Sequence, residues 1–360
     1  MRKTGGVREI WLIGGYGDVG KRVAAQLLKL ENVQIVLAGR SAGKAQAAAQ
    51  VLGGKVRGIG LDVTSDAAAA TLSAASVVVS LVESCPAEFP GELAAAGVTF
   101  IETSADADYL ARIAEGVPSR DMKGLVVLSV GTSPGLTNIL ARHVAQAAPA
   151  TTAIDICVEM SFGRHYGQAA TVWFLQNLAG DYPVKIEGDW NRVAPGQLSR
   201  KVRFADHMPA VPAIGYGFSD QAVIARTLDM ATVRTFVALT PAFLTRSLGL
   251  AAGRFLGRVL ARNASRYARW LNYLPSLGAV STRIAVEGFN KSGALTGAVR
   301  MASGDQSDIT AAMIALCVER VLDAPVTGVV HSDQIIDAEA AMARISRDVT
   351  GTRWVREGPV

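Results

Sequence analysis

Residues 9–20 read EIWLIGGYGDVG and decide the fold of the first part of the chain. The apolar run predicts a buried β-strand at 9–15, and apolar residues at helical spacing predict a helix over 18–30. The glycines between them fit G-x-G-x-x-G, a pattern that permits a tight turn, close approach of a pyrophosphate and close packing of helix on strand. Between a strand and a helix, it predicts a dinucleotide-binding loop with the helix N-terminus at the phosphates. The expected cofactor contacts here are Gly15, Tyr16, Gly17, Asp18, Val19 and Gly20.

The alternation of strand and helix continues to about residue 131. Short, nearly all-apolar runs alternate with amphipathic segments, which is typical of a parallel sheet covered by helices on both faces. We therefore predict an α/β domain with a Rossmann-type, doubly wound parallel sheet. The six expected strands are residues 9–15, 33–39, 56–64, 76–82, 98–104 and 124–131.

After about residue 150 this rhythm ends. A stretch rich in Pro, Gly and Arg at 183–216, an antiparallel hairpin that turns around 290–293 and a long helix over 305–322 follow. These features predict a second, α+β domain on a mainly antiparallel sheet. A shift in composition near 135–150 marks the expected boundary.

Composition limits the function classes. The chain has 360 residues, of which 50% are apolar, and a net charge of +5, which fits a two-domain enzyme. Its three cysteines and four histidines are scattered without the spacing of a metal site or a disulfide framework, so we expect no metal and a reducing compartment. Because neither a signal-peptide core nor a membrane-spanning run is visible, we expect a cytoplasmic protein.

The end of the second expected strand favours NADP(H) over NAD(H). An NAD site places Asp or Glu about 20 residues after the glycines, where it binds the ribose 2′-hydroxyl. This chain has Arg40, Ser41 and Lys44 there instead. An arginine can stack on the adenine and bind the 2′-phosphate, the serine can donate a hydrogen bond, and the lysine adds positive charge. The alternative is a solvated helix start without a ligand.

Residues after the third, fourth and fifth expected strands complete the predicted cofactor site, because ligands bind at the carboxyl ends of the strands of such sheets. Asp62 and Val63 are expected beside the adenine, and Leu81 and Val82 beside the nicotinamide ribose. Glu102, Thr103, Ser104 and Asp106 follow the fifth strand, and Thr103 and Ser104 are the expected cofactor contacts there. Asp106 is expected to cap a helix over 106–115, Tyr109 to pack in the interior, and Cys85 to be a small apolar residue.

Six motifs carry a resemblance to a known family: GGYGDVG (14–20), VLAGRS (36–41), GLDVT (60–64), VVSLV (78–82), FIETSAD (100–106) and SVGTSPGLTN (129–138). Together they resemble the saccharopine dehydrogenase-like family, in its NADP-binding saccharopine reductase branch. The resemblance implies a Rossmann domain at 1–135, an inserted α+β domain at 136–325 for substrate binding and dimer contact, and a return of the chain to the first domain at about 326–360. It also implies hydride transfer between NADP(H) and an imine or amine carbon, while relatives reduce activated C=C bonds of acyl chains.

The chain departs from that family after the sixth expected strand. Saccharopine reductases carry an Asp immediately before Pro-Gly, whereas this chain has Ser133, so a carboxylate that could bind a substrate ammonium is missing. Ser133 therefore stays a candidate catalytic residue, but saccharopine itself is in doubt as the substrate. His165 and Tyr166, in a polar and aromatic loop over 161–168, are candidate proton donors. The alternative for both is an ordinary surface loop.

One stretch stands apart from the family motifs. Between Asp229 and Glu287 there is no acidic residue, and residues 242–273 combine arginines at spacings of four with large apolar side chains. This segment can form a solvated basic face beside a dimer interface, lie on an anionic membrane, or grip an acidic acyl carrier.

Three functions remain open: an NADPH-dependent reductase of an imine (or the reverse amine dehydrogenase), a reductase of an enoyl or acyl substrate that is carrier-bound, linked to coenzyme A or lipid-linked, and a non-catalytic NADP(H)-binding protein. The Ser133 departure weakens the standard form of the first, and the basic segment favours the second. We expect no nucleic-acid partner, because the basic residues lie on an apolar helix rather than among base-stacking platforms. The apolar insert makes a homodimer the expected assembly.

Overall fold

A computed structural model of the chain describes residues 6–117, 122–162, 168–253, 255–271, 277–323 and 326–358. The chain divides into two compact units, each built from two segments. Unit 1 contains residues 1–136 and 310–344, and unit 2 contains residues 137–309 and 345–360.

Unit 1 is built on a parallel sheet of seven strands in the order β15-β6-β5-β4-β1-β2-β3. The strand order reverses at β1, since β2 and β3 lie on one side of it and β4, β5 and β6 on the other, which is the doubly wound arrangement. Its strands are β1 (Arg8–Ile13), β2 (Val33–Gly39), β3 (Val56–Gly60), β4 (Val77–Ser80), β5 (Thr99–Glu102), β6 (Leu125–Leu128) and β15 (Gly328–His331).

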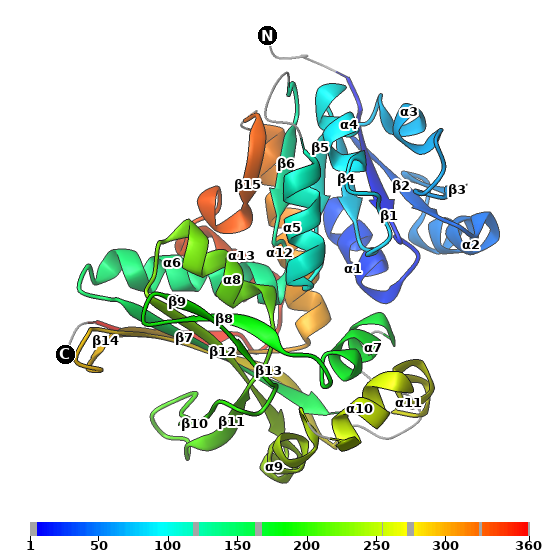
Figure 1. Ribbon diagram of the computed structural model, residues 1–360. Helices are drawn as coiled ribbons and strands as arrows, with labels where there is room; N and C mark the ends of the chain where they lie inside the picture. Colours follow the sequence, from blue (N-terminus) through cyan, green and yellow to red (C-terminus); the bar gives the residue numbers. More distant parts are fainter. Residues whose placement is uncertain are drawn as a thin grey trace. The chain divides into compact units, whose positions relative to one another are not determined.

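Helices connect these strands and cover both faces of the sheet. Figure 1 shows α5 on the near face and α12 on the far face. The helical elements are α1 (Asp18–Leu27), α2 (Ala42–Leu52), α3 (Ala68–Leu72), α4 (Phe89–Ala95), α5 (Ala107–Gly116), η1 (Thr132–Leu136), η2 (Ser332–Gln334) and, reaching from unit 1 into unit 2, α12 (Gln306–Asp323) and α13 (Ala338–Asp348).

Alternate residues of the strands fill separate cores on the two faces. Trp11, Val78 and Phe100 pack with Leu93 of α4 and Ile113 of α5 in one buried cluster. The residues between them in the strands are also buried, with almost no exposed surface. Burial on both faces explains why the strand sequences are almost continuously apolar. The predicted Rossmann-type fold is confirmed.

Unit 2 is built on a mixed sheet of nine strands, mostly antiparallel, in which β12 pairs with β7 in parallel. Its main path runs β10-β11-β12-β7-β13-β14-β16, and β8 pairs with β12 and β9. The strands are β7 (Ala153–Phe162), β8 (Tyr182–Ile186), β9 (Asp189–Val193), β10 (Ser199–Val202), β11 (Val211–Gly215), β12 (Thr232–Thr240), β13 (Leu277–Phe289), β14 (Leu295–Ser303) and β16 (Arg353–Glu357).

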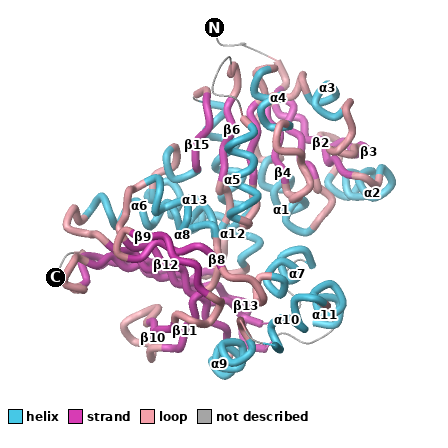
Figure 2. The backbone as a smooth tube through the Cα atoms, viewed as in Figure 1, coloured by secondary structure: helices cyan, strands magenta, loops and turns pink. Residues whose placement is uncertain are grey.

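The two faces of this sheet differ in chemistry. Figure 2 shows α6 (Thr137–Ala147) and α8 (Ser219–Thr227) along one face. Gly288 faces Val144 of α6 at close range, and it pairs with Ile154 of β7. The alternate β7 residues Asp155 and Glu159 therefore point to the opposite face, because successive side chains of a strand alternate.

Buried ion pairs fill that opposite face. Arg234 Nε donates to Asp155 Oδ1 at 2.7 Å, and Arg200 bridges Asp155 to Glu287, whose Oε2 it contacts at 2.6 Å. Arg300 Nη2 donates to the other oxygen of Glu287 at 2.9 Å. Each buried carboxylate is thus compensated by arginines, as burial of charge requires.

The observed units differ from the expected domain limits at the C-terminal end. The chain rejoins unit 1 at residue 310 rather than at about 326, since most of α12 belongs there. Residues 345–360, expected in the first domain, instead belong to unit 2, because β16 pairs with β14. The hairpin expected around 290–293 joins β13 to β14.

Candidate functional site

The glycine loop joins β1 to α1 and leaves space only for hydrogen at three positions. A Cβ atom on Gly15 would lie 2.7 Å from the Leu12 carbonyl oxygen, and one on Gly20 would lie 2.5 Å from the Gly15 Cα atom. Gly14 has φ of +78°, a conformation that glycine adopts without strain. Gly17 is the N-cap residue of α1. The first N–H groups of this helix lack intrahelical partners by geometry, so they can donate to an anion.

The segment after β4 lies directly against this loop. Leu81 N–H donates to the Ile13 carbonyl oxygen at 3.0 Å. Val82 lies so close that a Cβ atom on Gly14 would be 2.8 Å from its Cγ1 atom. The structure therefore brings together the glycine loop and the two residues expected beside the nicotinamide ribose.

The end of β2 places the residues expected to distinguish NADP(H) from NAD(H). Tyr16 of the glycine loop packs against Gly39, where a Cβ atom would lie 2.6 Å from its ring. Arg40 follows and is exposed, as is Lys44. Ser41 is the N-cap of α2, and its hydroxyl oxygen accepts from Lys44 N–H at 3.3 Å. The hydroxyl hydrogen of Ser41 remains available to donate, because a hydroxyl both accepts and donates.

The two residues expected beside the adenine have different environments. Val63 is buried in the core cluster of unit 1. Asp62 is exposed and accepts from Thr64 N–H at 3.0 Å and from Thr64 Oγ1 at 2.8 Å. These hydrogen bonds, and the positive charge of Arg40, lower the pKa of Asp62. Arg40 therefore lies close enough to Asp62 for its charge to act on this carboxylate.

Thr103 and Ser104 connect the segments that follow β5 and β4. Thr103 Oγ1 donates to the Ser80 carbonyl oxygen at 2.7 Å, and Ser104 Oγ donates to Glu83 Oε1 at 2.6 Å. Their hydroxyl groups therefore fix the geometry of the sheet edge in this structure. Asp106 accepts from Tyr109 N–H at 2.7 Å, so the expected helix cap at the start of α5 is present.

Glu102 is a buried carboxyl group at the same edge, and its side chain has no exposed surface. Its Oε1 atom accepts from the N–H groups of Thr103 and Ser104, at 2.8 and 3.0 Å. Tyr109 Oη lies 3.4 Å from Oε2. Burial raises the pKa of Glu102 to about 8, although the two backbone N–H groups oppose the shift. At neutral pH the group is therefore mostly protonated and holds a proton inside the sheet edge.

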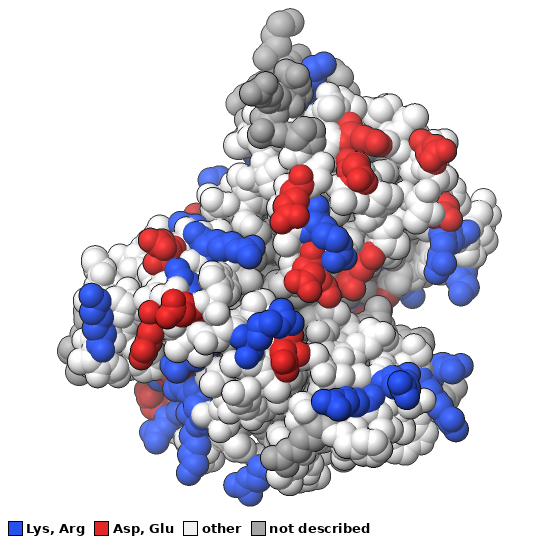
Figure 3. All heavy atoms as spheres, in the orientation of Figure 1, with Lys and Arg blue, Asp and Glu red and all other residues white. Residues whose placement is uncertain are grey.

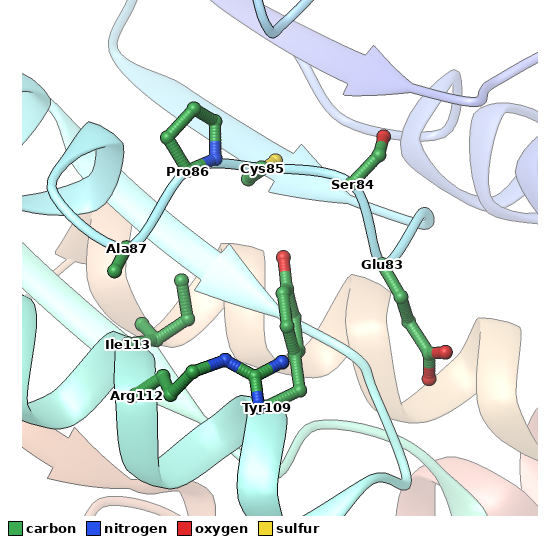
Figure 4. A pocket seen from close by; sticks show the side chains of 8 residues that line it. All are labelled: Glu83, Ser84, Cys85, Pro86, Ala87, Tyr109, Arg112 and Ile113. Atoms are coloured by element: carbon green, nitrogen blue, oxygen red, sulfur yellow. The ribbon is translucent and has the colours of Figure 1, made fainter.

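A cavity of about 310 Å³ is lined in part by Tyr109, the residue whose hydroxyl lies near Glu102. In Figure 4, the Tyr109 hydroxyl points toward the 84–86 segment and the Arg112 side chain lies next to the Tyr109 ring, 5.7 Å from its centroid. Burial, followed by the negative charge of Glu102, raises the pKa of the Cys85 thiol to about 12. Cys85 is therefore a neutral, small wall residue rather than a thiolate nucleophile. The cavity is lined by Glu83, Ser84, Cys85, Pro86, Ala87, Tyr109, Arg112 and Ile113.

The exit of β6 is a buried turn fixed by later parts of unit 1. Ser133 is buried, and the Ser133–Pro134 peptide bond is cis. Thr132 Oγ1 lies 2.9 Å from Thr310 Oγ1. Ser332 Oγ donates to the Ser129 carbonyl oxygen at 2.5 Å. The turn that carries Ser133 is therefore held by residues almost 200 positions away in the sequence.

Other expected site residues are not brought together here. His165 and Tyr166 lie outside the described residues. Asp333 lies in η2, and Asp337 Oδ1 accepts from Ala340 N–H at the start of α13. In the described part of the chain, no group of three or more His, Cys, Asp or Glu side chains is arranged to hold a metal ion. Likewise, no described helix has the length and apolar character needed to span a bilayer.

These features fit an NADP(H) molecule. The glycine loop excludes Cβ atoms at Gly15 and Gly20, and the N-terminus of α1 follows it. Arg40 is exposed at the end of β2, and residues 40–50 contain no carboxylate that would repel a 2′-phosphate. The sequence pattern located these residues but did not single out Glu102. One sequence feature indicated that Glu102 is buried, namely its place at the end of an otherwise apolar strand.

Comparisons with known proteins agree with this geometry. Residues 10–115 match the family model described as the saccharopine dehydrogenase NADP binding domain. No curated protein sequence matches the chain. The solved structure of apo saccharopine dehydrogenase (L-Glu forming) from Saccharomyces cerevisiae aligns over 97% of this chain and 100% of its own, with a TM-score of 0.61 and 12% identity. A myo-inositol dehydrogenase from Corynebacterium glutamicum aligns over 98% of this chain and 100% of its own, with a TM-score of 0.44 and 12% identity.

The likeness to the yeast structure shows a shared fold over nearly the whole chain. The family model confirms both the expected resemblance and the expected cofactor, NADP(H). Residues 10–115 of this chain thus match the NADP-binding domain of the saccharopine dehydrogenase family.

Proposed function

We propose that this protein is an NADPH-dependent oxidoreductase that transfers a hydride between NADP(H) and an imine or amine carbon of a small substrate. One observation carries the proposal: a glycine loop that is sterically closed to side chains leads to an exposed arginine at the end of β2. The arginine offers a planar set of donors that matches the oxygens of a phosphate. The matched domain family binds NADP, which supports the same cofactor.

The chain's own residues have separate roles in this proposal. The N–H groups at the start of α1 bind the pyrophosphate, while Arg40, Ser41 and Lys44 bind the 2′-phosphate. Leu81 and Val82 form an apolar wall beside the glycine loop, which orients the nicotinamide and excludes water. When bound, the cofactor supplies or accepts the hydride. Glu102, protonated and without exposed surface, positions the segment after β5 by accepting hydrogen bonds from the N–H groups of Thr103 and Ser104.

The second candidate is reduction of an enoyl or other acyl group, on a carrier, on coenzyme A or on a lipid. Ser133 favours it, because the buried turn after β6 carries a hydroxyl where saccharopine reductases carry a carboxylate. A site without that carboxylate lacks the partner that a substrate ammonium needs. We further propose a cytoplasmic homodimer. The three cysteines of the chain are free and buried, which supports a reducing compartment.

Fluorescence titration with NADPH and NADH tests the cofactor part. We expect NADPH to bind at least tenfold more tightly, a difference of about 1.4 kcal/mol. The Arg40→Ala variant should lose this preference, since it keeps the glycine loop but not the phosphate contact. Lys55→Ala is the matched control, because Lys55 is exposed but precedes β3 at the opposite end of the sheet. Equal affinities in the wild type would contradict the assignment.

Oxidation of NADPH in the presence of imines or enoyl thioesters then separates the two candidate reactions. Turnover of imines alone supports the first, and turnover of thioesters alone supports the second. Tight NADPH binding without turnover of any compound in either panel would count against both and favour a binding protein. Failure to bind either dinucleotide would remove the basis of the proposal.

A further inference from the structure

Three consecutive helices of unit 2 place large apolar side chains outward. They are α9 (Ala242–Ala251), α10 (Phe255–Arg262) and α11 (Ala264–Leu271). Phe255 is 81% exposed and Trp270 is 59% exposed. Within the described ranges, every exposed phenylalanine and leucine belongs to α9 or α10. The exposed large apolar residues of these helices are Phe243, Leu250, Phe255, Leu256 and Trp270.

The inward faces of the same helices carry small residues. Thr245 of α9, Gly257 of α10, and Ala264 and Ala268 of α11 are buried. A Cβ atom on Gly257 would lie 2.7 Å from the Ala251 carbonyl oxygen, so the packing there leaves no room for a larger residue. An ordinary surface helix turns its large apolar residues toward the core. On these helices the fully buried positions are held by small residues, and five large apolar side chains remain exposed to water, which is unfavourable unless a partner covers them.

Arginines share the outward faces with those apolar residues. On α9, Phe243, Arg246 and Leu250 are spaced by three and four, which places them on one face. On α11, Trp270 is one turn from Arg266 and next to Arg269. On α10, Phe255 precedes Arg258 and Arg262 at the same kind of spacing. Each helix thus presents an aromatic residue together with at least one guanidinium group.

The segment that forms this surface also lacks acidic residues. Residues 230–286 contain no Asp or Glu. In Figure 3, the region that corresponds to α10 and α11 in Figure 1 shows blue side chains among white atoms and no red ones. A partner for this surface must therefore be anionic and must also take up exposed aromatic and aliphatic groups.

We propose that the outward faces of α9, α10 and α11 bind the surface of an anionic lipid bilayer peripherally. Helices with arginines beside Phe, Leu and Trp lie in the bilayer interface, with the apolar groups below the headgroups and the guanidinium groups at the phosphates. This docking surface goes beyond the proposed oxidoreductase function and does not depend on it.

Two other occupants fit less well. In a symmetric pair of copies the same patch lies on both sides, so the arginines of one copy would face those of the other. An acidic protein would pair with the arginines, but the exposed apolar side chains are distributed over three helices, whereas protein partners draw most of their affinity from a few clustered anchor residues. A lipid surface needs no matching shape.

The test measures sedimentation of the full-length protein with vesicles of phosphatidylcholine, with or without phosphatidylserine. We expect binding to the vesicles that contain phosphatidylserine, weak binding to the others, and weakening by salt. Each arginine near an anionic surface contributes about a fivefold effect on partitioning, so Arg258→Gln/Arg262→Gln should weaken binding by about 25-fold. Phe255→Ser/Leu256→Ser should weaken binding without changing the charge.

The matched control is Trp190→Ser/Lys201→Gln, which removes one exposed aromatic residue and one exposed basic residue elsewhere on unit 2. It should bind like the wild type, and circular dichroism shows whether each variant is folded. A wild-type protein that binds neither vesicle type, or variants that bind as well as the wild type, would overturn the proposal. The proposal would also be overturned if the protein did not bind vesicles and Arg258→Gln/Arg262→Gln instead lost dimer formation or acyl-carrier-protein binding.

Discussion

Replacing Glu102 with glutamine should change how the stability of the protein depends on pH. The carboxyl group is fully buried, and its folded-state pKa of about 8 lies well above its ordinary value of 4.5. The folded protein therefore keeps a proton that the unfolded chain releases. Between these two pKa values the folded state binds more protons, so its stability falls as the pH rises, and the loss levels off above about pH 8.

The size of the effect follows from the two pKa values. Each unit of difference corresponds to about 1.36 kcal/mol. Across the whole window Glu102 therefore lowers the free energy of unfolding by about 5 kcal/mol, and from pH 6 to pH 9 by about 2.6 kcal/mol. A glutamine at this position does not titrate, while its carbonyl oxygen can still accept from the N–H groups of Thr103 and Ser104.

Thermal unfolding of both proteins from pH 6 to pH 9 measures this difference. Relative to the wild type, the midpoint of Glu102→Gln should rise by roughly 5–10 °C over this range, for a domain of 150–250 residues. Glu92→Gln on α4 is the control, because Glu92 is exposed. Its midpoint should follow that of the wild type. If the midpoint of Glu102→Gln changes with pH in the same way as that of the wild type, Glu102 does not titrate in this window and the reasoning is refuted.

Three further variants test the packing described above. Gly20→Ala should destabilise unit 1 by about 1–3 kcal/mol in calorimetry and weaken NADPH binding, because its Cβ atom would lie 2.5 Å from Gly15 backbone atoms. Gly43→Ala is the control and should be neutral or stabilising, because its Cβ atom would meet nothing within 4 Å. Asp106→Ala should cost about 1 kcal/mol in urea unfolding through loss of the cap of α5, and an unchanged midpoint would show that the cap does not contribute. Arg200→Met should lower the free energy of unfolding by about 3 kcal/mol, because it removes one partner from both Asp155 and Glu287. A decrease below about 1 kcal/mol would mean that Arg234 and Arg300 are enough to compensate these two carboxylates.

The cofactor loop could be predicted from sequence because its determinants are local. The strand, the glycines and the helix occupy consecutive positions, and the atoms that exclude a side chain are close in sequence: Leu12 at Gly15, and Gly15 at Gly20. The strand pattern likewise followed from burial on both sheet faces, since that leaves almost no polar positions in the strands.

The buried charges could not be predicted in the same way. Asp155 meets Arg200 and Arg234, which lie 45 and 79 positions later in the chain. Glu102 is adjacent in sequence to expected cofactor contacts, and the apolar strand before it indicates burial, but its raised pKa depends on complete burial by segments that are distant in the sequence. The limits of the two compact units differ from the expected domain limits for a related reason, because β16 is an ordinary short strand whose partner, β14, is known only from the pairing.

The division of each unit between two segments has a consequence for synthesis on the ribosome. The seven-stranded sheet gains its edge strand β15 only after residue 331 has emerged, and β14 gains its neighbour β16 only after residue 357. The first sheet therefore cannot be completed before residue 331 has been synthesised, nor the second before residue 357. Until then β6 and β14 present open edges, which are templates for pairing with other nascent chains. Production of this protein should accordingly depend on chaperones that shield those edges until β15 and β16 have emerged.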